Sequence, residues 1–542
     1  MTVGMNEAGA LEAAWLRLCC IADEGAATLR RMARSTLVRE CNDFAVVLAD
    51  AEGVVVAENA LGPPLFLGVL GGCLEGMLRI IPAPAWAAGD RIVTNDPWLS
   101  AGHTLDLAMA SAIHHAGQHV GYAVTIAHLP DIGGASFGAD SPSLFLEGLQ
   151  IPPIRWMAEG REDPVLAALL TANVRVPDQV LGDVRAQSAA HAALGRGVCE
   201  LLDDLGPDAL SRTSAALQVR AEQSMRQAIA AMPDGTWRAE LVADGAAGRP
   251  TRLACSITIA NGRLLVDYAG SSEQSAVGVN AVLSHTRAMT RYALKCLLAP
   301  DAPRNDGSYR AIDVVAPSGS ILNAHRPAPT AARQLTGQLL PGLVFACLAP
   351  VLPDRVAAES GSAPTLRANF TGLGRDGVPF AQMLMGSGGQ GATSRADGEP
   401  CLSFPGNTAF GSTEAFEAAA PLVIRRRTLL PDSGGEGAFR GGLGQEVEVE
   451  VTSDHPVELS MMADRVRNSP QGLLGGGPGT ATRVHLLDGT SIDPKGRTTL
   501  ALGARLVLRF AGGGGYGPVA SRDPAAIERD LAEGWASRGS GR

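Results

Sequence analysis

The chain contains 542 residues with a formal net charge of −10; 46% of its residues are hydrophobic and 18% are charged. One hydrophobic core does not serve a chain of this length, so we expect about two to four domains. The acidic balance argues against a nucleic-acid groove. No stretch approaches the about 20 uninterrupted apolar residues of a membrane span, so no membrane role is expected. The nine scattered cysteines include no Cys-x-x-Cys pair, which predicts reduced thiols and a cytoplasmic protein.

The first part of the chain predicts helices around a hairpin. Residues 8–34 have the apolar spacing of one amphipathic helix, and residues 43–58 predict a β-hairpin. Residues 66–81 predict a helix whose glycines allow close packing. Residues 177–231 again have helical spacing, and they end at Pro233-Asp234-Gly235, which we take as a domain boundary.

Strands dominate the rest of the chain. Alternation predicts strands at residues 236–243, 252–260 and 263–269, and a helix is expected at 278–298. From about residue 365, short strands alternate with glycine clusters, and many of the 65 glycines should serve turns with positive φ or a close backbone approach. We therefore predict a mixed α/β (α+β), multidomain protein. Its expected domains are an N-terminal metal-binding α/β domain (1–232), a central α/β domain (233–364) and a glycine-rich, β-dominated C-terminal domain (365–542).

One short pattern with metal-binding chemistry occurs twice. His103-Thr-Leu-Asp106 and His128-Leu-Pro-Asp131 share the spacing His-x-x-Asp and begin 25 positions apart, in a chain with only ten histidines. Imidazole and carboxylate groups are preferred ligands of Zn²⁺, Mn²⁺ and Fe²⁺. Two such pairs suffice to close one mixed site. We favour that interpretation over the alternative that each histidine caps a strand end and bonds its own aspartate.

The spacing also predicts how the two copies meet. Residues 106–113 and 119–127 predict two apolar strands joined by a turn at Gly117-Gln118. In an antiparallel pair, the start of the first strand lies opposite the end of the second. We therefore expect the two His-x-x-Asp copies to lie side by side.

Two other motifs predict different chemistry and are less convincing. Gly386-x-Gly388-x-x-Gly391 has dinucleotide-binding spacing, but no clear helix follows it and no lysine-bearing phosphate loop exists, so we favour tight β-turns. Gly134-Ala-Ser136-Phe-Gly138 matches a nucleophile elbow, but Pro142 interrupts the helix that should follow. Ser136 is therefore expected to be a loop residue beside the metal.

Several further segments occur in an order that identifies a family. They include Glu40-Cys-Asn-Asp43-Phe, Thr94-Asn-Asp96-Pro97, both His-x-x-Asp copies, Glu147-Gly148-Leu-Gln-Ile-Pro152-Pro153, Asn305-Asp-Gly307, Leu430-Pro-Asp432-Ser-Gly-Gly435 and Gly513-Gly-Gly-Tyr516-Gly. From about residue 35 to 530, the chain resembles the hydantoinase B/oxoprolinase family. That family comprises the B-type component of ATP-dependent N-methylhydantoinases, the C-terminal half of 5-oxoprolinase and the corresponding component of acetone and acetophenone carboxylases.

The resemblance implies a reaction shared with a partner. Family members act with a larger A-type subunit of actin-like ATPase fold, which binds ATP and phosphorylates a carbonyl oxygen of a cyclic amide or ketone. The B-type subunit is implied to carry the metal and to complete hydrolysis, or carboxylation in the carboxylases. We therefore predict an ATP-dependent amidohydrolase acting on a hydantoin, lactam or 5-oxoproline-like substrate, in a hetero-oligomer such as a dimer of heterodimers. A carboxylase subunit and a non-catalytic assembly subunit are the alternatives.

The resemblance also implies which residues form the site. The predicted ligands of a divalent ion, Zn or Mn, are Asp43, His103, Asp106 and His128. Asp131 is expected to act as general base, to bind as a fifth ligand or to orient His128. Asp96 is expected to form a turn, with metal ligand or base as the alternative. Such an ion would lower the pKa of a bound water towards about 7.

Two positions depart from the family pattern. Ala127 stands where the family has the first histidine of a His-His pair. Residues 401–417 lack the usual His- and Asn-rich stretch that ends in Thr-Pro-x-Glu. We therefore expect a substrate that differs from those of the named enzymes, and lower activity if the missing imidazole is catalytic.

Overall fold

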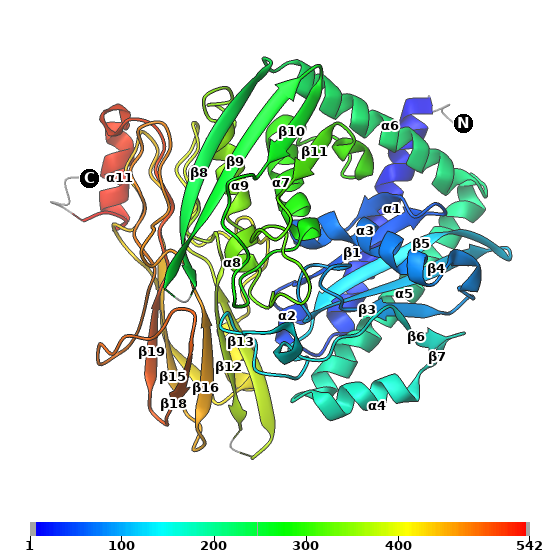
Figure 1. The fold of residues 1–542 in the computed structure, drawn as a ribbon, viewed down its shortest axis with the longest axis horizontal. Coiled ribbons are helices and arrows are strands. Elements are labelled where there is room, and N and C mark those ends of the chain that lie inside the picture. The colour runs from blue at the N-terminus through cyan, green and yellow to red at the C-terminus, as the bar shows by residue number, and fades with distance from the viewer. Residues whose placement is uncertain (1–6, 247, 375, 538–542) are drawn as a thin grey trace.

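The computed structural model describes residues 7–246, 248–374 and 376–537 and contains four β-sheets within these ranges. The strands of the last two sheets are interleaved along the chain. Helices pack against the first two sheets, and the last two sheets lie together on the opposite side of the molecule (Figure 1). This arrangement confirms the predicted mixed α/β, multidomain fold. Within the described ranges, each helix is too short or too polar to cross a membrane.

The N-terminal sheet is antiparallel and has the strand order β2-β1-β5-β4-β3-β6-β7. Its strands are β1 (Phe44–Asp50), β2 (Val55–Glu58), β3 (Arg91–Thr94), β4 (Asp106–His115), β5 (Gln118–His128), β6 (Ile154–Ala158) and β7 (Arg161–Glu162). Neighbouring residues of β1 enter opposite cores: Val46 packs in the core with α1 and α5, and Val47 packs in the core with α3. Because helices cover both faces, β1 is apolar at nearly every position and fully buried.

The helices of this part largely follow the sequence pattern. Helices α1 (Glu7–Met32) and α3 (Pro64–Ile80) confirm the two predicted at 8–34 and 66–81. The segment predicted as helical at 177–231 is two helices, α5 (Pro177–Leu205) and α6 (Ala209–Ala230). Gly206 separates them with a φ of 98°, which side-chain-bearing residues rarely adopt. The shorter elements are α2 (Thr36–Arg39), α4 (Pro164–Asn173), η1 (Ala83–Ala85) and η2 (Leu144–Leu146).

The central sheet has the order β11-β10-β9-β8, and only its β10–β11 pair is parallel among the described strands. Its strands are β8 (Gly235–Ala246), β9 (Arg249–Ala260), β10 (Arg263–Asp267) and β11 (Ile312–Val315). The crossover to β11 contains α7 (Leu283–Leu298) and η3 (Asp306–Tyr309). This helix begins five residues later than the prediction of 278–298, because Ala281 donates its amide to the Ile321 carbonyl instead of joining a helix. Helices α8 (Gln334–Gly337) and α9 (Leu340–Leu348) follow.

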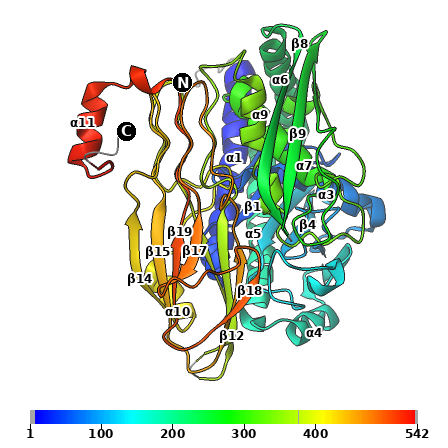
Figure 2. The ribbon, with the colours of Figure 1, turned by 60° about the vertical axis from the view of Figure 1, so that its left-hand side comes forward.

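The C-terminal part is a β-sandwich (Figure 2). One sheet has the order β13-β12-β16-β18 and the other β14-β15-β19-β17. The strands are β12 (Leu366–Leu373), β13 (Pro379–Gly386), β14 (Leu422–Leu429), β15 (Gln445–Val451), β16 (Val457–Met462), β17 (Arg483–Leu486), β18 (Arg497–Leu500) and β19 (Arg505–Arg509). Phe370 and Leu384 of one sheet pack against Val447 and Leu508 of the other. The remaining elements are α10 (Thr413–Ala419), η4 (Val519–Ser521) and α11 (Pro524–Ala532).

The glycine clusters of this sandwich confirm the predicted close backbone approach, whereas the tight β-turns predicted at 386–391 are not formed. The glycines at 386–391, 434–435, 441–442 and 512–515 all keep negative or extended φ values. They lie in segments whose backbones touch: a Cβ on Gly389 would come within 1.8 Å of the Gly442 carbonyl oxygen. Small size, and not positive φ, is therefore what these positions require.

Candidate metal centre

The two His-x-x-Asp copies meet at one end of the N-terminal sheet. Strands β4 and β5 form the predicted antiparallel hairpin, and their register places Asp106 directly opposite His128. The hairpin continues beyond the strands, since Leu129 donates its amide to the Leu105 carbonyl at 2.9 Å. The predicted meeting of the two copies is thereby confirmed.

Asp106 lies at the centre of the site, next to both histidines. Its Oδ1 lies 2.8 Å from His103 Nε2 and 2.9 Å from His128 Nδ1, and all three side chains are completely buried. Within the described residues, these three form the one group of at least three His, Cys, Asp or Glu side chains whose ligand atoms lie within 4.8 Å of one another. Two imidazoles and one carboxylate suit a borderline divalent ion.

The hydrogen bonds of His103 show that this group fits a cation. Its Nδ1 lies 2.8 Å from the Ala331 carbonyl, and because a carbonyl only accepts, Nδ1 carries the hydrogen. Burial, together with nearby Arg333, lowers the pKa of His103 to about 3, so the ring is neutral. The lone pair of Nε2 therefore faces the Asp106 carboxylate without a hydrogen bond between them. A metal ion is the group that both atoms can share.

A buried guanidinium balances the negative charge of the Asp106 carboxylate. Arg333 donates to Asp106 Oδ2 and to the Ala101 carbonyl. Although burial opposes ionisation, the adjacent Arg333 guanidinium holds the pKa of Asp106 well below its usual range. The carboxylate thus stays ionised and is fixed from both sides: Arg333 holds one oxygen, and the other faces the imidazoles.

The remaining predicted ligand, Asp43, lies close by but outside this group of three. It precedes β1, and its backbone carbonyl accepts from the amide of His128 at 3.0 Å. Its side chain is 3% exposed, and its Oδ2 is buried without a hydrogen-bond partner. Asp43 therefore stays a predicted ligand.

The two predicted catalytic aspartates each have an arginine partner. Asp131 accepts from Arg175 Nη1 at 2.7 Å and lines a small cavity. Asp96 accepts from the Trp98 amide at 2.9 Å, as a turn-forming aspartate does, and pairs with Arg326. Neither belongs to the group around Asp106, so their catalytic roles stay predictions.

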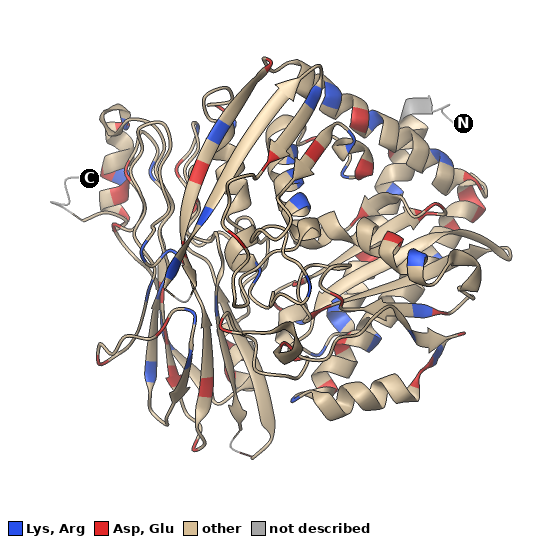
Figure 3. Ribbon diagram, viewed as in Figure 1, with Lys and Arg blue, Asp and Glu red and all other residues tan. Residues whose placement is uncertain are grey.

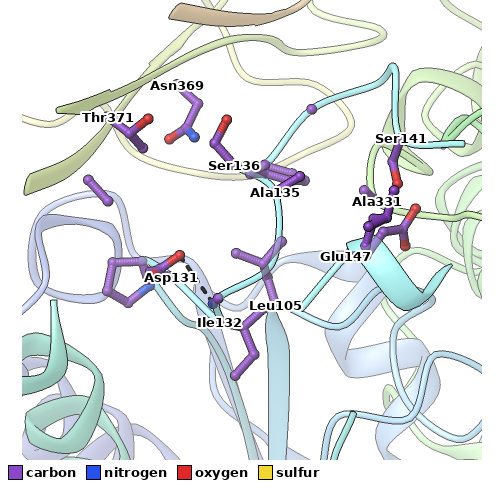
Figure 4. A pocket seen from close by; sticks show the side chains of 16 residues that line it. Leu105, Asp131, Ile132, Ala135, Ser136, Ser141, Glu147, Ala331, Asn369 and Thr371 are labelled. Carbon is purple, nitrogen blue, oxygen red and sulfur yellow. Dashed lines mark hydrogen bonds between the residues drawn. The ribbon is translucent and has the colours of Figure 1, made fainter. Parts of the chain in front are cut away.

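The cavity beside the centre has a volume of about 20 Å³, room for about one water molecule. Residues from widely separated parts of the chain line it, and Figure 4 shows Asn369 and Thr371 of β12 beside Ser136. Ser136 lies in the loop after β5 and donates to Glu458 of β16, so it is the loop residue that we expected. The C-terminal sandwich therefore forms one wall of the cavity.

Glu147 is a functional candidate that our sequence interpretation missed. It lines the same cavity, is 5% exposed, and accepts from the Thr330 amide at 2.9 Å. Burial raises the pKa of Glu147 to about 7, the range suited to general acid–base work. Its only signal in the sequence was its place in the Glu147-Gly148 segment.

Arg367 of β12 was also missed. Its Cζ lies 5.9 Å from the centroid of the Phe137 ring, and that ring lies 5.6 Å from each of the His103 and His128 rings. The alternation of polar and apolar residues along β12 is the signal that could have indicated a polar face. The sequence did not indicate that this face meets the hairpin.

These observations define a buried imidazole–carboxylate centre between an N-terminal sheet and a C-terminal sandwich. The chain belongs to the Hydantoinase B/oxoprolinase family, whose model matches residues 9–519. It is 28% identical over 536 residues to the B-type subunit of a putative D-/L-hydantoinase of Pseudomonas sp. (strain NS671), covering 94% of this chain and 90% of that protein. The beta subunit of the caprolactamase of Pseudomonas jessenii is also 28% identical, over 532 residues and with the same coverage. The crystal structure of the ATP-dependent caprolactamase from Pseudomonas jessenii matches with a TM-score of 0.90 at 26% identity, covering 98% of this chain and 95% of that chain.

Proposed function

We propose that this chain is the metal-bearing B-type subunit of an ATP-dependent amidohydrolase that opens a cyclic amide. The observation that carries the proposal is the pair of facing lone pairs on His103 Nε2 and Asp106 Oδ1, 2.8 Å apart. The names of the similar proteins, one from a hydantoinase and one from a caprolactamase, supply the substrate class.

In this proposal His103, Asp106 and His128 hold a divalent ion, Zn or Mn, with Asp43 as fourth ligand. Such an ion would act as a Lewis acid towards a carbonyl or phosphoryl oxygen and would make water more acidic. Arg333 keeps the Asp106 carboxylate ionised and oriented. The Ala331 carbonyl fixes the His103 tautomer.

Proton transfer is assigned to the carboxylates that line the small cavity. Glu147, with a pKa of about 7, holds or releases a proton near neutral pH. Asp131 is a second candidate base, oriented by Arg175. Asp96 positions the loop before His103, because its carbonyl accepts from the Ser100 amide at 2.9 Å. The small volume of the cavity limits the access of bulk water to a reactive intermediate.

The partner in this proposal is an A-type ATPase subunit, which binds ATP and phosphorylates the substrate. Two similar proteins are themselves named as subunits, which supports a two-component enzyme. We also propose a cytoplasmic location. All nine cysteines are free thiols in the structure, which supports a reducing compartment.

The test is ATP consumption by the chain co-expressed with an A-type partner. Substrates to compare are a hydantoin, caprolactam, 5-oxoproline and acetone, each with and without bicarbonate. We expect ring opening of a cyclic amide coupled to ATP hydrolysis, independent of bicarbonate, and no ATP hydrolysis by this chain alone. ATP consumption that requires both a ketone and bicarbonate would establish the carboxylase alternative instead. Turnover by the A-type partner alone would contradict a catalytic role for this chain.

A further inference from the structure

Arg367 is a buried cation without a counter-ion. The residue is 5% exposed, and its Nε and Nη1 are buried without hydrogen-bond partners. In the described part of the chain, no carboxylate oxygen lies within 4.0 Å of the Arg367 guanidinium nitrogens, the distance limit for an ion pair. Buried guanidinium groups are normally paired, because an uncompensated charge costs several kcal/mol in a dry interior. The position therefore calls for an anion.

The strand geometry directs Arg367 towards the metal centre. Residues 367, 369 and 371 of β12 share one face, since side chains alternate along a strand. Asn369 and Thr371 on that face line the cavity beside Ser136 (Figure 4). Arg367 itself lies over Phe137, whose ring contacts both histidines of the centre.

The neighbouring charges leave Arg367 available. Arg333 is occupied by Asp106 and the Ala101 carbonyl. On the adjacent strand, Met462 is paired with Arg367 and offers no charge. Asp43 does not lie within ion-pair distance (4.0 Å) of Arg367, and its buried Oδ2 has no hydrogen-bond partner either.

We propose that Arg367 binds an oxyanion group of the reacting molecule beside the metal centre. A guanidinium presents parallel N–H donors that match a phosphoryl or a carboxylate group in a two-point contact. The inference rests on the proposed function, in which a phosphorylated carbonyl compound reaches this centre. It adds that recognition of the anion comes from the C-terminal sandwich, while the metal ligands come from the N-terminal hairpin.

Calorimetric titration of the purified, metal-loaded chain with inorganic phosphate tests the proposal. We expect about one saturable site per chain and affinity about tenfold or more weaker in Arg367→Gln. Arg367→Lys should lie between the two, because it keeps the charge but loses the two-point contact. Arg509→Gln is the matched control, since Arg509 is exposed on the same sandwich and pairs with Glu446; it should bind phosphate as the wild type does.

A titration with acetate distinguishes the source of the oxyanion. Binding of phosphate but not acetate assigns the subsite to a phosphoryl group, and the reverse assigns it to a substrate carboxylate. Either result supports the proposal only if the binding is weaker in Arg367→Gln than in the wild type. Equal affinity in the wild type and Arg367→Gln, or no anion binding by the wild type, would overturn it.

Thermal unfolding separates anion binding from a structural role and covers the case in which Arg367→Gln folds poorly. In anion-free buffer, Arg367→Met should unfold at the same or a higher temperature than the wild type, because it removes an unpaired buried charge. Phosphate should raise the Tm of the wild type and leave that of Arg367→Met unchanged. A destabilised Arg367→Met whose Tm still rises with phosphate would refute the subsite. Metal content and cyclic-amide turnover are measured separately, so failure of the proposed function is not mistaken for failure of the subsite.

Discussion

Asp106 links the two histidines and the arginine of the candidate centre. One oxygen faces His103 and His128, and the other accepts from Arg333. The geometry explains why a His-x-x-Asp spacing serves here: the aspartate begins β4, and the histidine three residues earlier folds back over it. The second copy contributes its histidine to the same carboxylate, while its aspartate pairs with Arg175. The aspartates of the two His-x-x-Asp copies therefore have different partners.

Replacing His103 and His128 together with Ala should empty the metal centre. The purified wild type should carry about one divalent ion per chain, measured by elemental analysis, because the three-ligand group needs both imidazoles. His115→Ala is the control, since His115 lies at the exposed end of β4 and pairs with Asp203. A metal-free wild type, or full occupancy in the double variant, would contradict the centre.

Glu147 should make the protein less stable as pH rises. Its folded-state pKa is about 7, above its ordinary value of 4.5, so between these values the folded state binds more protons than the unfolded state. Stability therefore falls through that window and levels off above about pH 7. Glu147→Gln should remove a pH-dependent contribution on the order of 3 kcal/mol, measured by urea unfolding at pH 4.5 and 7.5.

Glu58 provides the control for this titration. Burial also raises the pKa of Glu58 to about 7, but its partner is Arg304 and it lies on β2. Glu58→Gln should therefore leave the Glu147 contribution intact. An identical pH profile for the wild type and Glu147→Gln would show that Glu147 titrates normally.

The hairpin β4–β5 and the glycine segments are the elements that decide the architecture. The hairpin needs only a local turn to bring its ends together, so its register follows from the sequence. The glycine segments pack backbone against backbone, as the hydrogen bond from the Gly513 amide to the Gly442 carbonyl at 2.9 Å shows. Contacts of this kind depend on which segments meet, and the sequence does not specify that.

Gly389→Ala should destabilise the sandwich, whereas Gly195→Ala should not. A Cβ at Gly389 would collide with the Gly442 carbonyl at 1.8 Å, and neither backbone can move freely. We expect a cost of about 3 kcal/mol, seen as a lower unfolding midpoint. Gly195 lies inside α5 with nothing within 4 Å of its Cβ position, so alanine there should stabilise by up to about 1 kcal/mol. Equal midpoints for the two variants would contradict the packing role of the glycine segments.

At the scale of the whole molecule, the centre belongs to no single sheet. Its candidate ligands come from the N-terminal hairpin, Arg333 and Ala331 come from the segment before α8, and Arg367 comes from the sandwich. One hydrophobic cluster likewise includes residues from all three parts of the chain. Acidic and basic residues are both scattered over the outer helices and strands (Figure 3).

The co-expressed chain and its A-type partner should form a stable complex, such as a dimer of heterodimers. In the proposed reaction a phosphorylated intermediate passes between the two proteins without meeting bulk water, and a closed interface meets that need. Lasting interfaces usually bury upwards of about 2,000 Å². Size-exclusion chromatography with light scattering should give one peak with the mass of the complex. Separate elution at micromolar concentration would favour a stand-alone role for this chain.

The sequence by itself determined the family, through motifs spread over most of the chain, and a set of local features: the helices α1 and α3, the hairpin and the meeting of its two His-x-x-Asp copies. The local features follow from periodicity and from residues within about 30 positions of one another, where chain connectivity limits the possible arrangements. The tertiary structure alone decided that Asp106 is the shared carboxylate, that Asp131 pairs with Arg175, and that Arg333, Glu147 and Arg367 surround the centre. Arg333 and Arg367 lie more than 200 residues from the hairpin. Only the packing of sheets against one another, driven by burial of their apolar faces, brings them to it.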